Sequence, residues 1–298
     1  MLGGKPFNYD IGLRFSDYVS HITRFNNPDM LFAKNYWVGM KYGDIWGYHI
    51  DGLFASDEEA ANYGIDMSKV NAIINASTGD INPVTGKPGV RAGDLKYVDL
   101  DGDGKINQGE GRVGASGDYR VIGNSQPRYN YGVNLGGSWN GFDLSAFFQG
   151  IGHMDWYPQY EVRQFWALYA RPFCTFIPRD FQNMYWTEEN PDAYFPRPRG
   201  YVAGVGKGRE LTETNDRYLQ NIGYLRLKNL TVGYTLPDKL TRKAGIAQLR
   251  FYFTGENLFY FAPGLHSKYI DPEMAQTNGN LRIYPWQKTL MFGIDITL

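Results

Sequence analysis

Cysteine is almost absent from this sequence, because its 298 residues contain only Cys174. A disulfide framework within the chain is therefore excluded, and we expect an inert loop thiol. Long apolar runs are also missing. No stretch approaches the ~20 apolar residues of a spanning helix, which excludes a helical membrane protein. Residues 1–5 lack the apolar core of a signal peptide, so the chain is predicted to be either cytoplasmic or not a complete precursor.

An excess of charge of one sign is missing as well. The formal net charge is −1 at pH 7, from 30 basic and 31 acidic residues. We therefore expect no nucleic-acid partner. The four histidines are isolated and lack the spacing of a zinc site. No nucleophile elbow or H-E-x-x-H motif is present, and the sequence predicts a protein that is not an enzyme.

Aromatic residues and glycine are what the chain has in abundance. Aromatics make up 16% of the residues, led by 23 Tyr and 18 Phe, and there are 36 Gly. The mean hydropathy is −0.44, a value typical of soluble proteins. A transmembrane β-barrel is compatible with that value, because its strands place apolar residues at every second position and its loops and lumen are polar.

Alternation with a period of two, the pattern of a strand with two different faces, marks several segments. It is clearest at 286–298, where Leu290 and every second residue after it are apolar and the opposite face is mostly polar or small. Segment 222–235 changes parity, which a one-residue bulge near Lys228 and Asn229 would explain. Including the weaker candidates, we count about seven strands. They are 9–25, 38–50, 128–138, 142–150, 222–235, 248–260 and 286–298.

The connections between these strands alternate in length. Short connections are predicted at 26–37, 139–141 and 236–247, and long irregular ones at 51–127, 151–221 and 261–285. Outer-membrane barrels alternate short periplasmic turns with long extracellular loops in this way. If the last strand ends at the periplasm, all three long stretches are extracellular. The predicted fold is therefore all-β, an antiparallel transmembrane β-barrel with long extracellular loops.

A soluble β-sandwich or jelly roll also has two-faced strands. Three features favour the barrel. Aromatic residues such as Trp139 and Trp286 flank the apolar face, as in the girdles at a membrane interface. The opposite face is small and polar, as lumen residues are. The loops are longer than those of most sandwiches.

Residues 99–110, with the sequence DLDGDGKINQGE, carry the most specific motif. They match the EF-hand loop pattern D-x-D-x-D-G, with Ile at position eight and Glu at position twelve. Calcium takes six to eight oxygen ligands, and the first three carboxylates converge only if the chain turns sharply, as a glycine at position six permits. The predicted ligands are Asp99, Asp101, Asp103, the backbone carbonyl of Lys105, Asn107 through a water, and Glu110 as a bidentate ligand.

The two helices of an EF-hand are missing around this motif. Residues 93–98 are typical of a strand, and 111–114 are not helical. This favours a structural calcium site that staples a long extracellular loop, rather than a calmodulin-like switch. The alternative is a solvated acidic turn without a metal.

Six segments follow one another in a specific order and spacing. They are YVDLDGDG at 97–104, VIGNSQP at 121–127, YGVN at 131–134, GFDLSAFFQG at 141–150, YLRLKNLTVGYTLP at 224–237 and GENLF at 255–259. This series resembles the C-terminal third of SusC/RagA-type TonB-linked outer-membrane transporters of Bacteroidetes. The resemblance covers nearly the whole chain.

The resemblance implies a closed barrel of about 22 strands in outer-membrane lipid. It also implies an N-terminal plug, a TonB-contacting box and a SusD-like surface lipoprotein as a lid. The implied activity is the import of glycans or peptides, energised by the TonB complex. Signal peptide, TonB box, plug and first strands are not found here. Residues 1–298 are therefore predicted to be a C-terminal segment with about the last seven strands, and the missing N-terminal part would contact the TonB complex.

The predicted extracellular loop 151–221 is rich in aromatic residues, and Trp156 and Trp166 are candidates for stacking on substrate. The alternatives are a self-packed loop or a docking surface for the lid protein. Two other functions stay open at this point. One is a secreted, soluble, calcium-stabilised β-protein that binds carbohydrate, and the other is an enzyme that acts on polysaccharide.

Overall fold

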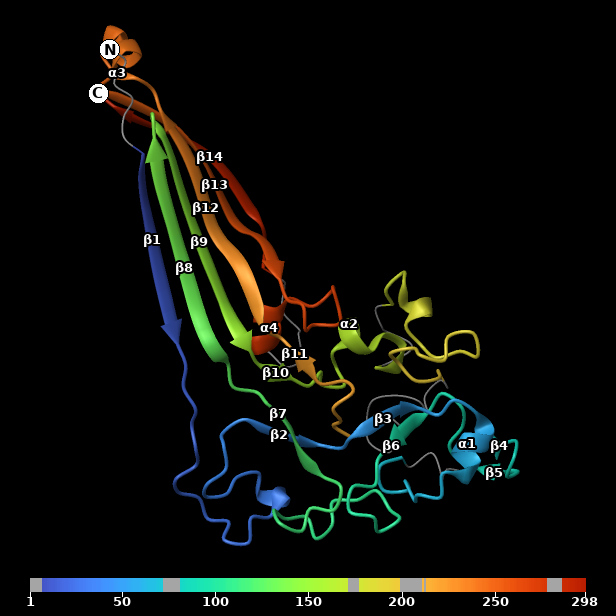
Figure 1. The fold of residues 1–298 in the computed structure, drawn as a ribbon. Helices are drawn as coiled ribbons and strands as arrows, with labels where there is room; N and C mark the ends of the chain where they lie inside the picture. The colour runs from blue at the N-terminus through green and yellow to red at the C-terminus, as the bar shows by residue number, and fades with distance from the viewer. Residues whose placement is uncertain (1–6, 72–80, 171–176, 199–210, 212, 278–285) are drawn as a thin grey trace.

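The computed structural model describes residues 7–71, 81–170, 177–198, 211, 213–277 and 286–298, so Cys174 lies outside the described part. The chain forms a long antiparallel sheet and, beyond one end of it, a layer of loops and short elements (Figure 1). We call residues 17–127, 154–223 and 262–288 together the loop layer. None of the helices in the described ranges is long and apolar enough to cross a bilayer.

The sheet has six strands, in the order β1-β8-β9-β12-β13-β14. They are β1 (Asn8–Ser16), β8 (Arg128–Trp139), β9 (Phe142–His153), β12 (Tyr224–Thr235), β13 (Gln248–Phe261) and β14 (Thr289–Thr297). The predicted all-β, antiparallel fold is confirmed. The bulge is confirmed too, because the register of β12 shifts between Leu227 and Asn229 against both neighbouring strands.

One predicted strand does not join this sheet. Residues 38–50 contribute to β2 (Asp44–Gly47), which pairs with β7 (Arg120–Asn124) inside the loop layer. The described residues thus supply six sheet strands, where the sequence predicted about seven. Alternation misled here because Met40, Tyr48 and Ile50 are buried in the loop layer. The predicted short turn at 26–37 is also wrong, since β1 pairs directly with β8 and all of 17–127 is one connection.

Apolar residues of neighbouring strands line up on one face of the sheet. A single row runs from Ile11 of β1 to Leu290 of β14, and its members are Ile11, Leu135, Ala146, Leu230, Gly255 and Leu290. Along β14, the side chain of Phe292 is 83% exposed, and those of Ile294 and Ile296 are 58% exposed. An extended, exposed apolar face on a long antiparallel sheet is what a lipid-facing barrel wall requires. We call it the outer face.

The opposite, inner face is polar and carries an ion-pair ladder. Arg250 on β13 donates to both carboxylate oxygens of Asp143 on β9, over 3.0 and 2.7 Å, and to Asp295 on β14 over 3.0 Å. Strand β12 lies between β13 and β9, so the arginine must pass over it. Gly233 makes this possible, because a Cβ there would lie 2.6 Å from the guanidinium and 2.5 Å from Asp143.

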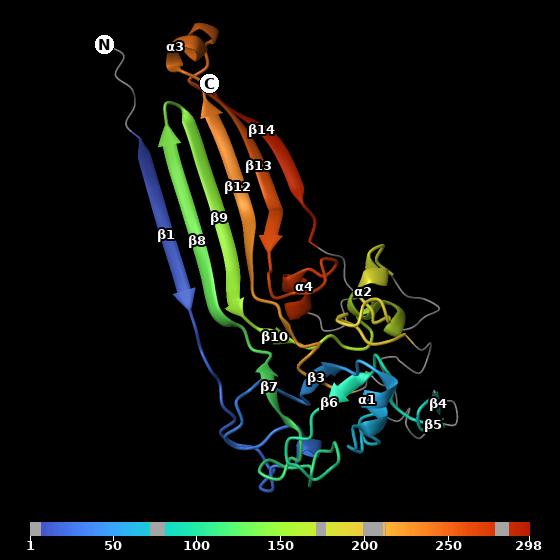
Figure 2. The same cartoon turned by 45° about the vertical axis from the view of Figure 1, so that its right-hand side comes forward.

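Short connections gather at the end of the sheet that is opposite to the loop layer (Figure 2). Strands β8 and β9 are joined by Asn140 and Gly141, whose φ angles of 49° and 89° fit a two-residue hairpin turn of type I′. The chain between β12 and β13 contains α3 (Asp238–Thr241) and η5 (Arg242–Ala244), and the C-terminus lies at the same end.

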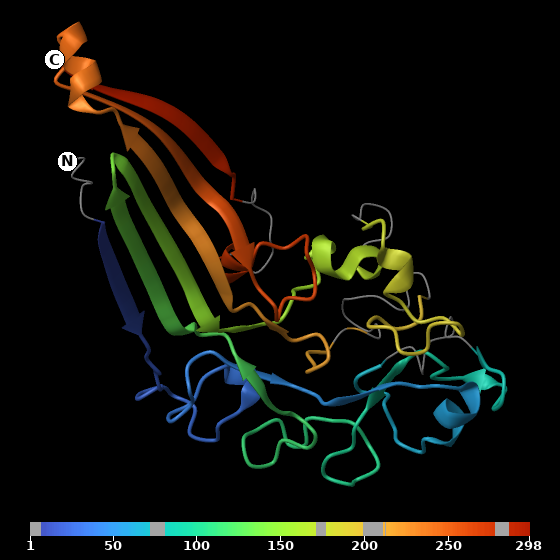
Figure 3. The ribbon, with the colours of Figure 1, turned by 45° about the horizontal axis from the view of Figure 1, so that its top comes forward.

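The loop layer has secondary structure of its own (Figure 3). Its first connection holds η1 (Phe32–Lys34), β2, β3 (Ile50–Leu53), α1 (Asp57–Asn62), β4 (Ile81–Asn82), β5 (Lys87–Pro88), β6 (Leu95–Tyr97) and β7. The second holds β10 (Asp155–Trp156), α2 (Arg163–Trp166), η3 (Ala167–Tyr169), η4 (Phe181–Asn183) and β11 (Gln220–Asn221), and the third holds α4 (Pro272–Thr277).

The hydrophobic core of the described chain lies mainly in this loop layer. Its fully buried side chains come from all along the first two connections, and they include Phe54, Leu95, Tyr97, Ile106, Trp166, Tyr169, Phe195 and Tyr218. Long connections with no core of their own are uncommon in compact folds. Here the loops bury enough apolar surface to fold as a layer.

The two faces of β14 make a direct test of the lipid-facing assignment. We expect Phe292→Arg to lower the free energy of unfolding of the assembled barrel by about 2–4 kcal/mol, because it places a charge in hydrocarbon. Met291→Arg is the matched control, since Met291 lies beside Phe292 but on the inner face. Urea unfolding in lipid vesicles measures both. Equal destabilisation by the two variants would contradict the assignment.

Candidate metal site and loop layer

The acidic loop 99–110 connects β6 to β7 within the loop layer. Asp99, Asp101 and Asp103 each contribute one carboxylate oxygen to a cluster whose oxygens lie within 4.8 Å of one another. Within the described part of the chain, none of the three forms an ion pair with a basic side chain. Three clustered carboxylates without a cationic partner are the donor set that a hard cation takes.

Backbone hydrogen bonds hold this loop in its shape. The two carboxylate oxygens of Asp99 accept the N–H groups of Gly102 and Gly104, over 2.6 and 2.8 Å. Both glycines have positive φ angles, 78° and 80°, which other residues rarely adopt. Asp103 accepts the N–H of Lys105 over 2.8 Å with one oxygen and the side-chain amide of Asn107 over 3.1 Å with the other.

The environment moves the pKa values of two of these carboxyl groups in opposite directions. The N–H of Gly104, followed in effect by that of Gly102, lowers the pKa of Asp99 below its ordinary value. Partial removal from water raises the pKa of Asp101, and the nearby carboxylates of Asp103 and Asp118 add to the rise. Crowded negative charge of this kind is relieved by a bound cation.

Sequence reasoning missed Asp118, which braces the loop from outside the motif. Its side chain is fully buried. One carboxylate oxygen accepts the N–H groups of Leu100 and Asp101, over 2.6 and 3.4 Å, and the other accepts the N–H of Asn107 over 2.9 Å. Asp118 lies eight residues beyond the last motif position, so no motif spacing could have indicated it.

Ile106, at position eight of the loop, is fully buried in the main core, as the motif leads one to expect. Its N–H donates to the carbonyl of Asp66 over 2.9 Å, and the N–H of Asp66 donates to the carbonyl of Gly104 over 2.9 Å. The acidic loop is thereby fixed to a second segment of the same connection.

Glu110 does not lie with the three aspartates. Its side chain is 66% exposed, and it forms an ion pair with Arg112 over 2.7 Å. The side chain of Asn107 lies between Asp103 and the carbonyl of Lys105, 3.5 Å from the latter. Of the predicted ligands, the structure brings the three aspartate side chains together, and Glu110 would have to leave Arg112 to join them.

The two tryptophans that were candidates for substrate contact lie in the core. Trp166 is fully buried, and its indole N–H donates to the carbonyls of Pro158 and Gln159. Trp156 is 6% exposed. Neither ring offers a free face on which a sugar can stack, so the structure favours the alternative, a self-packed loop.

The third connection is fastened to the inner face of the sheet by buried charges. Arg226 on β12 is 2% exposed, and its Nη2 lies 2.5 Å from Asp271 and its Nε 3.0 Å from Glu273. Lys228 pairs with the same Glu273 over 2.7 Å. Removing one partner from such a buried pair leaves an uncompensated charge, which is strongly destabilising. The ion pairs thus hold α4 beside the end of the sheet that faces the loop layer.

The chain is similar in sequence and in fold to known proteins. TonB-dependent receptor P3 of Formosa agariphila is 26% identical over 98% of this chain, and receptor P39 of the same organism is 24% identical over 98%. The chain spans only 27% and 28% of the lengths of these two relatives. A solved structure of the RagAB peptide transporter has the same fold, with a TM-score of 0.60 and 20% identity over 99% of this chain and 28% of its own. No family model matches the sequence.

The fold and these relatives define the class of protein: it is an outer-membrane β-barrel protein related to TonB-dependent receptors. Within that class, the resemblance to the C-terminal part of SusC/RagA-type transporters is confirmed.

The brace at Asp118 can be tested apart from any metal. We expect Asp118→Ala to lower the local stability of residues 99–119 by about 2 kcal/mol or more, because it leaves the N–H groups of Leu100 and Asn107 without their acceptor. Hydrogen exchange of these amides, measured in EDTA, reports the loss. Asp101→Ala is the control, since its exposed carboxylate accepts one weak bond of 3.2 Å. Similar exchange in both variants would contradict the role of Asp118.

Proposed function

We propose that this chain forms part of the wall and the extracellular loops of a TonB-dependent outer-membrane transporter, which imports glycans or peptides together with a SusD-like surface lipoprotein. The observation that carries the proposal is the two-faced sheet, with its exposed apolar outer face and its inner ladder around Arg250. A soluble carbohydrate-binding protein would not leave such a face in water. The named relatives, which are receptors, likewise favour a transporter over an enzyme.

The sheet needs further strands to work in this way. Strands β1 and β14 each have one neighbour in the described sheet, and an unpaired edge in hydrocarbon leaves backbone groups without partners. We propose that additional strands of the same protein close the barrel, and that its N-terminal plug and TonB box contact the TonB complex. In this arrangement the loop layer, including 51–127 and 151–221, is extracellular.

Transport can be tested in cells that carry or lack the gene. We expect deletion of the gene to abolish uptake of at least one labelled oligosaccharide or oligopeptide. An uncoupler of the proton-motive force should abolish uptake of the same compound by the wild type. Labelled oligosaccharides and oligopeptides, supplied separately, measure uptake and separate the two substrate classes. Uptake that continues unchanged after deletion, across both panels, would contradict the proposal.

We propose in addition that loop 99–110 binds Ca²⁺ as a structural site that staples the first connection. Asp99, Asp101, Asp103 and the carbonyl of Lys105 would bind the ion directly, with Asn107 acting through a water. Glu110 would complete the site after leaving Arg112. The support is the cluster of three carboxylates within 4.8 Å, together with the brace at Asp118 that pre-forms the loop.

Calcium should protect the loop layer from proteolysis in isolated outer membranes. We expect this protection to need roughly tenfold or more calcium in Asp99→Asn, because a directly bound carboxylate is lost. Arg112→Ala is the control, since it removes the competitor for Glu110 and leaves every proposed ligand in place. Protection that is equal with calcium and with EDTA in the wild type would rule out the metal.

A further inference from the structure

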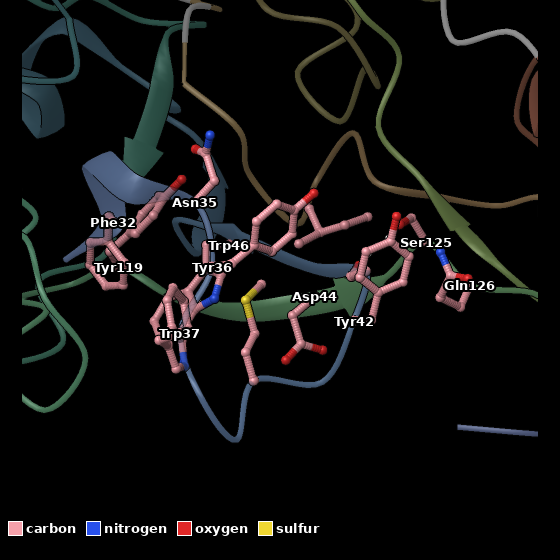
Figure 4. A pocket seen from close by; sticks show the side chains of 13 residues that line it. Phe32, Asn35, Tyr36, Trp37, Tyr42, Asp44, Trp46, Tyr119, Ser125 and Gln126 are labelled. Atoms are coloured by element: carbon pink, nitrogen blue, oxygen red, sulfur yellow. Dashed lines mark hydrogen bonds between the residues drawn. The ribbon is translucent and has the colours of Figure 1, made fainter. Parts of the chain in front are cut away.

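An open cavity of about 400 Å³ lies in the first connection of the loop layer, and none of the acidic loop's carboxylates is among its described lining residues. It is formed by η1 and the turn after it, by β2, and by residues 119–126 around β7 (Figure 4). We call it the aromatic pocket. Its size is in the range of small-ligand sites in proteins.

Six of its thirteen described lining residues are aromatic. Tyr36 and Tyr42 lie with their rings nearly parallel, 6.1 Å apart, and are 37% and 42% exposed. Behind them, the ring of Trp46 packs against Phe32 at 4.7 Å and stacks on Tyr119 at 5.9 Å. The pocket thus offers exposed flat faces that are backed by a rigid aromatic cluster.

Polar groups without partners are interleaved with these rings. The indole N–H of Trp46 is buried and has no hydrogen-bond partner in the described chain. Asp44 uses one carboxylate oxygen to accept the side chain of Asn124 over 2.9 Å, and no described residue engages the other. The side-chain amides of Asn35 and Gln126 line the pocket and are likewise unengaged among the described residues. The free carboxylate oxygen of Asp44 and the two free amides therefore offer hydrogen-bonding groups beside the exposed rings.

The pocket is held open by backbone-directed hydrogen bonds. Asn27, which is 2% exposed, donates to the carbonyls of Leu31 and Tyr36 over 2.9 Å each and accepts the N–H of Leu31 over 3.0 Å. On the other side, Asn124 donates to the carbonyl of Tyr42 over 3.1 Å. A ligand that binds here therefore meets a pre-organised site and loses little affinity to ordering it.

We propose that the aromatic pocket binds a neutral pyranose residue of a glycan. A sugar ring has apolar C–H faces that stack on aromatic rings and a rim of hydroxyl groups that both donate and accept. Stacking on Tyr42 satisfies the first property. The free oxygen of Asp44 and the side-chain amides of Asn35 and Gln126 satisfy the second.

Other ligand classes fit these groups less well. An apolar peptide side chain would cover the rings but would leave the carboxylate and the two side-chain amides unpaired. Among the described residues, no Lys or Arg lines the pocket, so an acidic ligand or a peptide carboxylate has no described cation to pair with there. The inference rests on the proposed transport function and deepens it, because it assigns the glycan class to a receptor loop.

The test uses the complete receptor, purified in detergent and titrated calorimetrically with neutral tetrasaccharides of glucose, xylose, mannose and galactose. We expect at least one of them to bind. We expect Tyr42→Ala and Asp44→Asn each to weaken that binding at least tenfold. Tyr160→Ala is the matched control, since Tyr160 is an exposed tyrosine of another connection, and it should bind like the wild type.

The inference is overturned if no tetrasaccharide binds the wild type, or if both pocket variants bind as tightly as Tyr160→Ala. Binding of tetrapeptides that Tyr42→Ala abolishes, without any saccharide binding, would assign the pocket to peptides instead and would also overturn it. Protease resistance of each variant shows that it is folded. Uptake by cells, measured in parallel, separates the two proposals, because intact uptake with no saccharide binding would refute the pocket and leave transport standing.

Discussion

Every backbone N–H and C=O inside a hydrocarbon layer must find its partner in a neighbouring strand, and the whole sheet depends on this constraint. It demands long paired strands, which β8, β9, β12 and β13 provide with one bulge in β12. It also fixes which side chains share a face, so that apolar residues form rows outside and polar residues form rows inside. The Arg250 ladder exists only because that register sets Gly233 between the arginine and Asp143.

The chain therefore follows two solvation rules in one molecule. In the sheet, large apolar side chains such as Phe292 point outward and polar ones inward. In the loop layer, Trp166, Tyr97 and Phe195 are buried as in an ordinary soluble domain. Buried ion pairs join the two parts at the end of the sheet that faces the loop layer, between Arg226 and Lys228 of β12 and Asp271 and Glu273 of the third connection.

The sequence alone predicts the part of the structure that follows from a period of two. Strands, the β12 bulge and the β8–β9 hairpin could be found in this way, because lipid on one side and a polar lumen on the other impose strict alternation. The same pattern at 38–50 arises by chance in a loop that buries Met40 and Tyr48, and no local signal distinguishes the cases. Contacts between distant segments were not predictable either. Asp118, the Glu110–Arg112 pair and the burial of Trp166 all depend on how the loops fold back on one another.

One backbone joint connects the aromatic pocket to the acidic loop. The N–H of Phe32 donates to the carbonyl of Gly111 over 2.9 Å, and the N–H of Val113 donates to the carbonyl of Met30 over 3.2 Å. Between these two hydrogen bonds, Leu31 and Arg112 lie opposite each other as an isolated antiparallel bridge. The wall of the aromatic pocket and the end of the acidic loop are therefore parts of one hydrogen-bonded scaffold. A change that loosened either segment would strain these bonds and would be felt at both places.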